Sequence, residues 1–84
     1  MTRDELAVIW GEAAVAAEIA GKYEGRSRES LSPDARLGLV RSFRAAQEQI
    51  DRVADAMADE EDFSGELRLL ALSGRLALLC ERYE

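Results

Sequence analysis

The residue types that most often carry out chemistry in proteins are sparse in this 84-residue sequence. It has no histidine and a single cysteine, Cys80. A nucleophilic cysteine or serine needs a nearby base, and zinc takes histidine or several cysteines as ligands. We therefore predict no catalytic residue, no metal site and no cofactor, and we expect Cys80 to pack in an apolar core.

The spacing of one row of carboxylates raises the question of whether they bind a metal ion. Glu48, Asp51, Asp55 and Asp59 share a face of the second expected helix. Magnesium-dependent all-α phosphohydrolases also mount carboxylates on helices, but they need them on at least two facing helices. The rest of this chain supplies only scattered acids. We interpret the row as a solvated acidic face that binds a protein partner with a basic surface.

Positive charge gathers around the first expected break in the chain. Lys22, Arg26 and Arg28 precede a helix start at Ser32, and Tyr23 lies among them. Free N–H groups at a helix start favour anions, and an aromatic ring can stack on a base. This pattern predicts a site for a small anionic ligand such as a nucleotide, with a solvated connecting loop as the alternative.

These residues are expected to lie on or between helices, because the helix-favouring residues Ala, Leu, Glu and Arg dominate the composition. Thr2 and Glu5 fit a capping box, Ser32 and Pro33 give an N-cap followed by proline at the first helical position, and Ser64 is a plausible cap for a third helix. We predict helices over residues 3–24, 33–61 and 65–83, with a loop over 25–32.

Short connections between three helices predict an all-α fold, a single domain over residues 1–84 with an up-down-up antiparallel bundle and a long central helix. The first and third helices each carry a second apolar stripe that one bundle does not cover, which predicts a homo-oligomer. Trp10 fits the bundle core and a subunit interface equally well. The residues expected at the oligomer interface are Trp10, Val15, Ile19, Leu67, Ala71, Gly74 and Leu78.

The net charge of −6 argues against duplex DNA or an anionic membrane as the main partner. The sequence shows no export signal and no apolar run long enough for a membrane span, so we expect a cytoplasmic protein.

The function expected from these features is that of a small, acidic, non-catalytic interaction protein that binds itself and modulates, by inhibition, a larger protein. In size and charge it is similar to phage- or mobile-element inhibitors and to immunity proteins. Two alternatives stay open: an oligomeric binder of an anionic, nucleotide-like ligand, and a small structural oligomer subunit.

Overall fold

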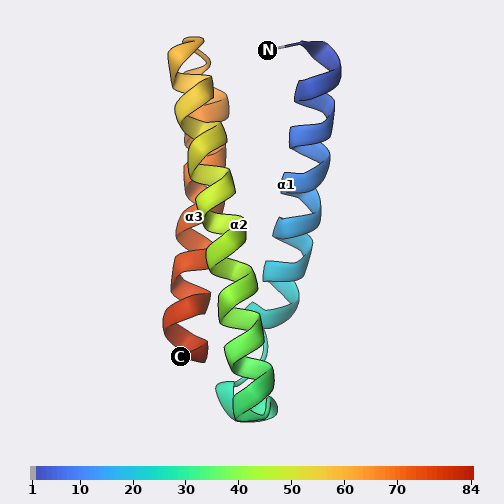
Figure 1. Cartoon of the computed structure of the whole chain (residues 1–84), viewed down its shortest axis with the longest axis vertical. Helices are drawn as coiled ribbons and strands as arrows, with labels where there is room; N and C mark the ends of the chain where they lie inside the picture. The colour runs from blue at the N-terminus through green and yellow to red at the C-terminus, as the bar shows by residue number, and fades with distance from the viewer. Residues whose placement is uncertain (1) are drawn as a thin grey trace.

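The computed structural model describes residues 2–84, which form three α-helices and one short 3-10 helix. In chain order these are α1 (Arg3–Glu24), η1 (Arg28–Ser30), α2 (Pro33–Asp59) and α3 (Phe63–Tyr83). Consecutive α-helices run in opposite directions, as Figure 1 shows. The all-helical fold predicted from the sequence is confirmed, and the packing is that of a bundle.

The first two helices begin where the sequence predicted. The Thr2 hydroxyl accepts a hydrogen bond from the Glu5 N–H at 3.1 Å, and the Glu5 carboxylate accepts one from the Thr2 N–H at 3.3 Å. This reciprocal capping box satisfies two N–H groups that the helix itself cannot pair. Ser32 caps α2 in the same way by accepting from the Ala35 N–H at 3.2 Å, with Pro33 as the first helical residue.

The second break lies two residues earlier than predicted. Helix α2 ends at Asp59, not at residue 61, and α3 begins at Phe63, not at residue 65. The reason is the cap, because the Asp62 carboxylate accepts a hydrogen bond from the Gly65 N–H at 3.0 Å. Asp62 therefore caps α3 in place of Ser64, which lies inside the helix.

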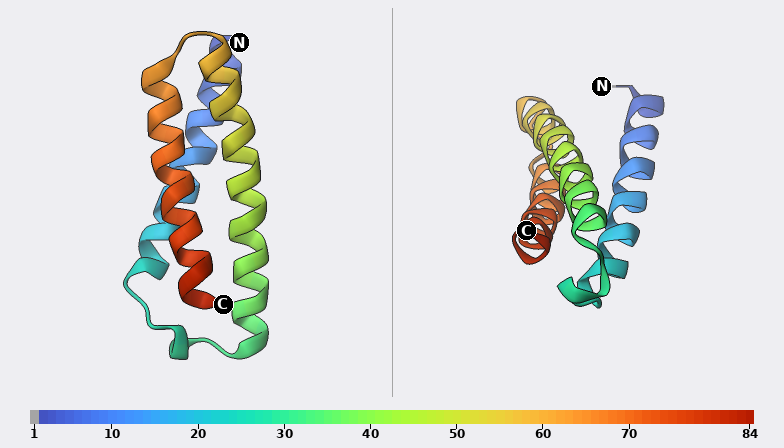
Figure 2. Two further views of the ribbon diagram at one scale, coloured as in Figure 1. Left: turned by 90° about the vertical axis from the view of Figure 1, so that its left-hand side faces the viewer. Right: turned by 60° about the horizontal axis from the view of Figure 1, so that its bottom comes forward.

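The core lies mainly between α2 and α3, which run antiparallel and side by side (Figure 2). Both helices place apolar residues three and four apart, so each presents a continuous stripe to the other. Cys80 belongs to this core, as predicted. The buried apolar side chains of the two helices are Val40, Phe43, Ile50, Ala54, Met57, Leu69, Leu72, Leu76, Leu79, Cys80 and Tyr83.

Helix α1 packs against this pair far less deeply. Ala20 is its only buried residue, while Leu6, Ile9 and Trp10 of the predicted inner face are half-buried. Figure 2 shows α1 standing to one side of the paired helices. The radius of gyration is 13.8 Å, compared with about 12 Å expected for a compact chain of this length. The molecule is a tight helical hairpin with a loosely applied third helix.

Candidate interaction surface

An apolar groove of about 750 Å³ lies between α1 and α2. On α1 its lining includes Val8, Val15 and Ile19, which keep 60%, 56% and 41% of their surface exposed. Water-exposed aliphatic side chains that converge on one hollow are typical of a binding surface. We refer to this surface as the α1–α2 groove, and its principal lining residues are Val8, Gly11, Val15, Ile19, Leu39 and Phe43.

The groove lies beside the face of α1 that packs against the core. In the middle of the helix that face consists of small residues, Ala13, Ala16, Ala17 and Ala20, while Leu6, Ile9, Trp10 and Tyr23 pack against the core towards its two ends. Residues three or four apart share a helix face, so Val8, Val15 and Ile19 project together at the side of the core-facing residues. The result is a wall of valine and isoleucine beside the core.

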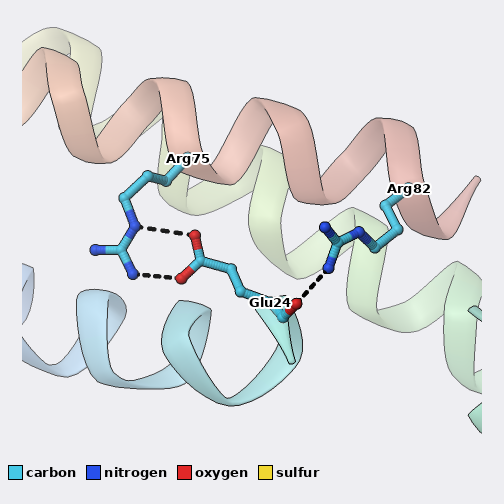
Figure 3. Close-up of polar contacts among 3 residues, drawn as sticks. All are labelled: Glu24, Arg75 and Arg82. Carbon is cyan, nitrogen blue, oxygen red and sulfur yellow. Dashed lines mark hydrogen bonds and ion pairs between the residues drawn. The ribbon is translucent and has the colours of Figure 1, made fainter. Parts of the chain in front are cut away.

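A cluster of polar contacts holds the C-terminal end of α1 against α3 (Figure 3). The Arg75 guanidinium donates to both oxygens of the Glu24 carboxylate, at 3.1 and 2.5 Å, and Arg82 donates to the Glu24 carbonyl oxygen at 2.6 Å. The hydrogen bond from Arg75 lowers the pKa of Glu24, and Glu24 in turn raises the pKa of Arg75. We call Glu24, Arg75 and Arg82 the α1 clamp.

A buried tyrosine secures the same end of α1. The Tyr83 hydroxyl lies 2.6 Å from the Tyr23 carbonyl oxygen and 3.0 Å from that of Arg26, so its proton is shared between two acceptors. The rings of Tyr83 and Tyr23 meet edge to face, with centroids 6.0 Å apart. These contacts pair two main-chain carbonyl groups at the point where α1 ends, and they fix the direction in which the helix leaves the bundle.

The N-terminal half of α1 has no comparable set of polar contacts to the bundle. Its aromatic residue, Trp10, lies over the Arg68 guanidinium of α3, with the guanidinium carbon 4.5 Å from the ring centroid. The Glu12 carboxylate accepts a hydrogen bond from Gln49 of α2 at 3.5 Å, which is long for such a bond. Figure 1 shows this half of α1 diverging from α2 and α3. The helix is therefore fastened at one end and open at the other.

A second apolar surface lies on the side of α3 that faces away from α2. Phe63, Leu67 and Leu78 keep 57%, 65% and 67% of their surface exposed there, and Ala71 and Gly74 are exposed between them. Apart from Trp10, the residues predicted at an oligomer interface therefore lie on two separate surfaces. Trp10 belongs to neither surface, because it lies at the contact between α1 and α3.

The predicted acidic face is only partly available to a partner. The Asp51 carboxylate is half-buried and accepts a hydrogen bond from the Ser73 hydroxyl of α3 at 2.6 Å. Glu48, Asp55 and Asp59 are exposed, and none of them forms an ion pair with another residue in the range 2–84. The free part of this acidic face is therefore a row of three carboxylates along α2.

The residues predicted to hold an anion are not all directed at one site. The half-buried Tyr23 ring packs edge to face against two other aromatic rings. The guanidinium carbon of Arg26 lies 5.7 Å from the centroid of the Tyr23 ring. Arg28 instead donates two hydrogen bonds to the carbonyl oxygen of the C-terminal residue, at 3.2 and 2.7 Å. Ser32 caps α2, and Lys22 is exposed. Tyr23 and Arg28 therefore fasten the connection between α1 and α2 to the rest of the chain.

The thiol of Cys80 is placed for packing. Burial raises its pKa, and the sulfur lies 3.8 Å from the Val40 carbonyl oxygen. A raised pKa keeps the thiol protonated and unreactive at neutral pH. Within residues 2–84, no three side chains of His, Cys, Asp or Glu converge closely enough to hold a metal ion.

Two features of this surface, the α2 wall of the groove and the α1 clamp, could not be predicted from the sequence. The helical spacing of Val8, Val15 and Ile19 is visible there, but Leu39 on the opposite wall has the same pattern as a core residue. The α1 clamp has no local signature, because Glu24 and Arg75 are 51 residues apart. Only the chain path brings the two charges together.

Comparisons with known proteins identify no relative of this chain. No family model, no curated protein and no solved structure matches the chain. Across the described residues, none of the helices combines the length and the apolar character that crossing a bilayer requires.

Proposed function

We propose that this chain is a non-catalytic interaction protein, and that the α1–α2 groove is its principal docking surface for an amphipathic helix. One observation carries the proposal: Val8, Val15 and Ile19 line an open apolar groove while each keeps at least two fifths of its surface exposed. An amphipathic helix commonly binds by laying its apolar face into such a groove.

The energy available at the groove suits a reversible complex. Fully burying a valine or isoleucine side chain stabilises a complex by about 1.5–3 kcal/mol. The three α1 side chains are already about half-covered, so each would contribute about 1 kcal/mol more. The partner's apolar side chains would add a similar amount, against which the entropy cost of association must be set.

The free carboxylates on α2 support a second element of the proposal, the choice of partner. Glu48, Asp55 and Asp59 form an acidic row on α2 outside the groove. An acidic surface steers the chain towards a basic partner and can compete for a basic groove of a larger protein, which makes inhibition a concrete outcome of binding. In this proposal the groove supplies the affinity for a docked helix, and the acidic row, which lies outside the groove, meets the basic surface of the larger protein.

The anionic-ligand alternative has less support. Such a site needs free cations near an accessible aromatic face. Here Arg28 is engaged by a main-chain carbonyl, and the Tyr23 ring is packed among other rings. The other alternative is a purely structural oligomer subunit, whose contacts with neighbouring subunits would use the same apolar surfaces, including the α1–α2 groove.

The proposal can be tested by placing a photo-reactive benzophenone side chain at Val15 in the cell that makes the protein. Light should produce a crosslinked species at Val15, and the added change Ile19→Lys should abolish it. The same label at Glu29, an exposed residue of η1, is the control and should give no crosslink. Crosslinks at Asp55 with none at Val15 would instead assign docking to the acidic row, and no crosslink at either position would refute both.

A further inference from the structure

We infer that the occupant of the α1–α2 groove is a second copy of this chain, with the two α1 helices packed antiparallel about a two-fold axis. This inference rests on the proposed function, since it names the partner of that groove. Three features of α1 carry it: the symmetry of its exposed stripe, an unfilled glycine at its middle, and the placement of its charges.

The exposed stripe of α1 is self-complementary when the helix is reversed. Val8 and Ile19 lie at its two ends, and Gly11 and Val15 lie between them. In an antiparallel pair centred between positions 13 and 14, Val8 of one copy approaches Ile19 of the other. The Gly11 backbone of each copy then lies near Val15 and Ala16 of the other. A two-fold contact needs this match, because the same patch must fit itself.

Gly11 leaves open space on the groove side of α1. A Cβ atom added at this position would meet nothing within 4 Å, and glycine in a helix interior costs roughly 0.5–1 kcal/mol relative to alanine. The glycine lies in the groove lining, between Val8 and Val15. A small residue at the centre of a contact lets two helix backbones approach closely, and antiparallel pairing gives it the larger Val15 as its neighbour.

The charges on α1 favour the antiparallel direction. Asp4 and Lys22 are eighteen residues apart in the sequence, which is about five full turns, so they lie on the same edge of the helix. Both are exposed, and neither forms an ion pair with any other described residue. Antiparallel packing places Asp4 of each copy opposite Lys22 of the other, whereas parallel packing would place the two Asp4 carboxylates at the same end.

The surface of the single chain is also larger than its mass requires. It exposes 5556 Å², while a compact monomer of 9.3 kDa is expected to expose roughly 5,000 Å². The excess is close to the roughly 600 Å² that each partner buries in the smallest stable interfaces.

A disulfide experiment tests both the self-association and its direction. In a Cys80→Ala background, the single variants Asp4→Cys and Lys22→Cys are mixed in equal amounts and oxidised, and the products are identified by intact mass. An antiparallel pair brings position 4 of one copy beside position 22 of the other. It holds the two copies of position 4 about 27 Å apart, far beyond the roughly 7 Å that a disulfide spans between Cα atoms.

We expect nearly all of the crosslinked product to be the 4–22 mixed species, compared with half for random pairing. Leu37→Cys, on another face of α2 and outside the groove lining, measures the collisional background in the same Cys80→Ala chain. Products dominated by 4–4 and 22–22 pairs would overturn the antiparallel arrangement. If the mixed 4–22 disulfide formed no faster than the disulfide between two Leu37→Cys chains, self-association through the groove would be overturned. A crosslink to a different protein at Val15 in cells would still uphold the proposed function.

Discussion

At the scale of single residues, Glu61 is the one non-glycine residue in the described chain with a positive φ, at 61°. It follows the C-terminal cap of α2, where the Asp62 N–H donates to the Met57 carbonyl oxygen at 2.8 Å and the Glu61 N–H donates to that of Ala58 at 3.0 Å. These two bonds form a Schellman motif, whose left-handed residue is usually glycine. The turn into α3 is therefore made with an unfavourable residue.

We expect Glu61→Gly to raise the free energy of unfolding by about 1 kcal/mol, because it relieves the left-handed strain of a residue with a Cβ atom. Glu61→Ala removes the same charge but keeps the Cβ atom, so it should give little of this gain. Chemical denaturation of both variants at one protein concentration measures the difference. Equal stability changes in the two would assign the effect to charge and not to the backbone.

Gly65 is the glycine that this packing requires. A Cβ atom there would lie 2.7 Å from the Met57 sulfur and 2.7 Å from an Asp62 carboxylate oxygen, and Met57 is fully buried. We expect Gly65→Ala to lower the free energy of unfolding by about 1–3 kcal/mol through overpacking. Gly38→Ala, in open space on α2, is the matched control and should raise it by about 0.5–1 kcal/mol. If Gly65→Ala proved as stabilising as the control, the close packing described here would be wrong.

At the scale of elements, α1 is held by its C-terminal end and its attachment should depend on pH. Because the pKa of Glu24 is lowered in the folded chain, the contribution of the α1 clamp is fully present above the ordinary carboxyl pKa. It is lost as the pH falls through the lowered value. Trp10, the only tryptophan, lies on Arg68 of α3 and reports whether α1 is docked.

We therefore expect the Trp10 fluorescence maximum to shift towards that of an exposed indole as the pH falls from about 6 to about 3. In Glu24→Gln the clamp lacks the carboxylate charge at every pH. The fluorescence maximum of Trp10 at pH 6 should therefore already lie closer to that of an exposed indole, and its shift between pH 6 and pH 3 should be smaller. Identical pH profiles in the two proteins would mean that the clamp does not control the position of α1.

The sequence predicted these elements well where the signals were local. The capping residues Thr2 and Ser32, and the proline after Ser32, lie beside the N–H groups they satisfy or replace. The second break was placed two residues late because Asp62 and Ser64 are both good cap residues, and only packing selects Asp62. The sequence predicted only the α1 wall of the groove, as a second apolar stripe on that helix. Its other wall and the α1 clamp depend on how the chain returns in three dimensions.

In the whole molecule, the α1–α2 groove is the surface that we propose a second copy covers. Three observations support this assignment: the exposed side chains of α1, the loose attachment of its N-terminal half and the large surface of the single chain. The assignment also implies that one polar substitution in the groove should break the assembly without unfolding the helices.

Sedimentation equilibrium at micromolar to hundred-micromolar concentrations tests this most directly, with Val15→Lys and Leu37→Lys as a matched pair. The two wild-type side chains are similarly exposed, at 56% and 53%, but only Val15 lines the groove. The unaltered chain and Leu37→Lys should sediment with twice the chain mass at the higher concentrations. Val15→Lys should stay at the chain mass with unchanged helical circular dichroism. An unaltered chain that remains monomeric throughout, or a Val15→Lys chain that still dimerises, would show that the groove is not the interface between two copies.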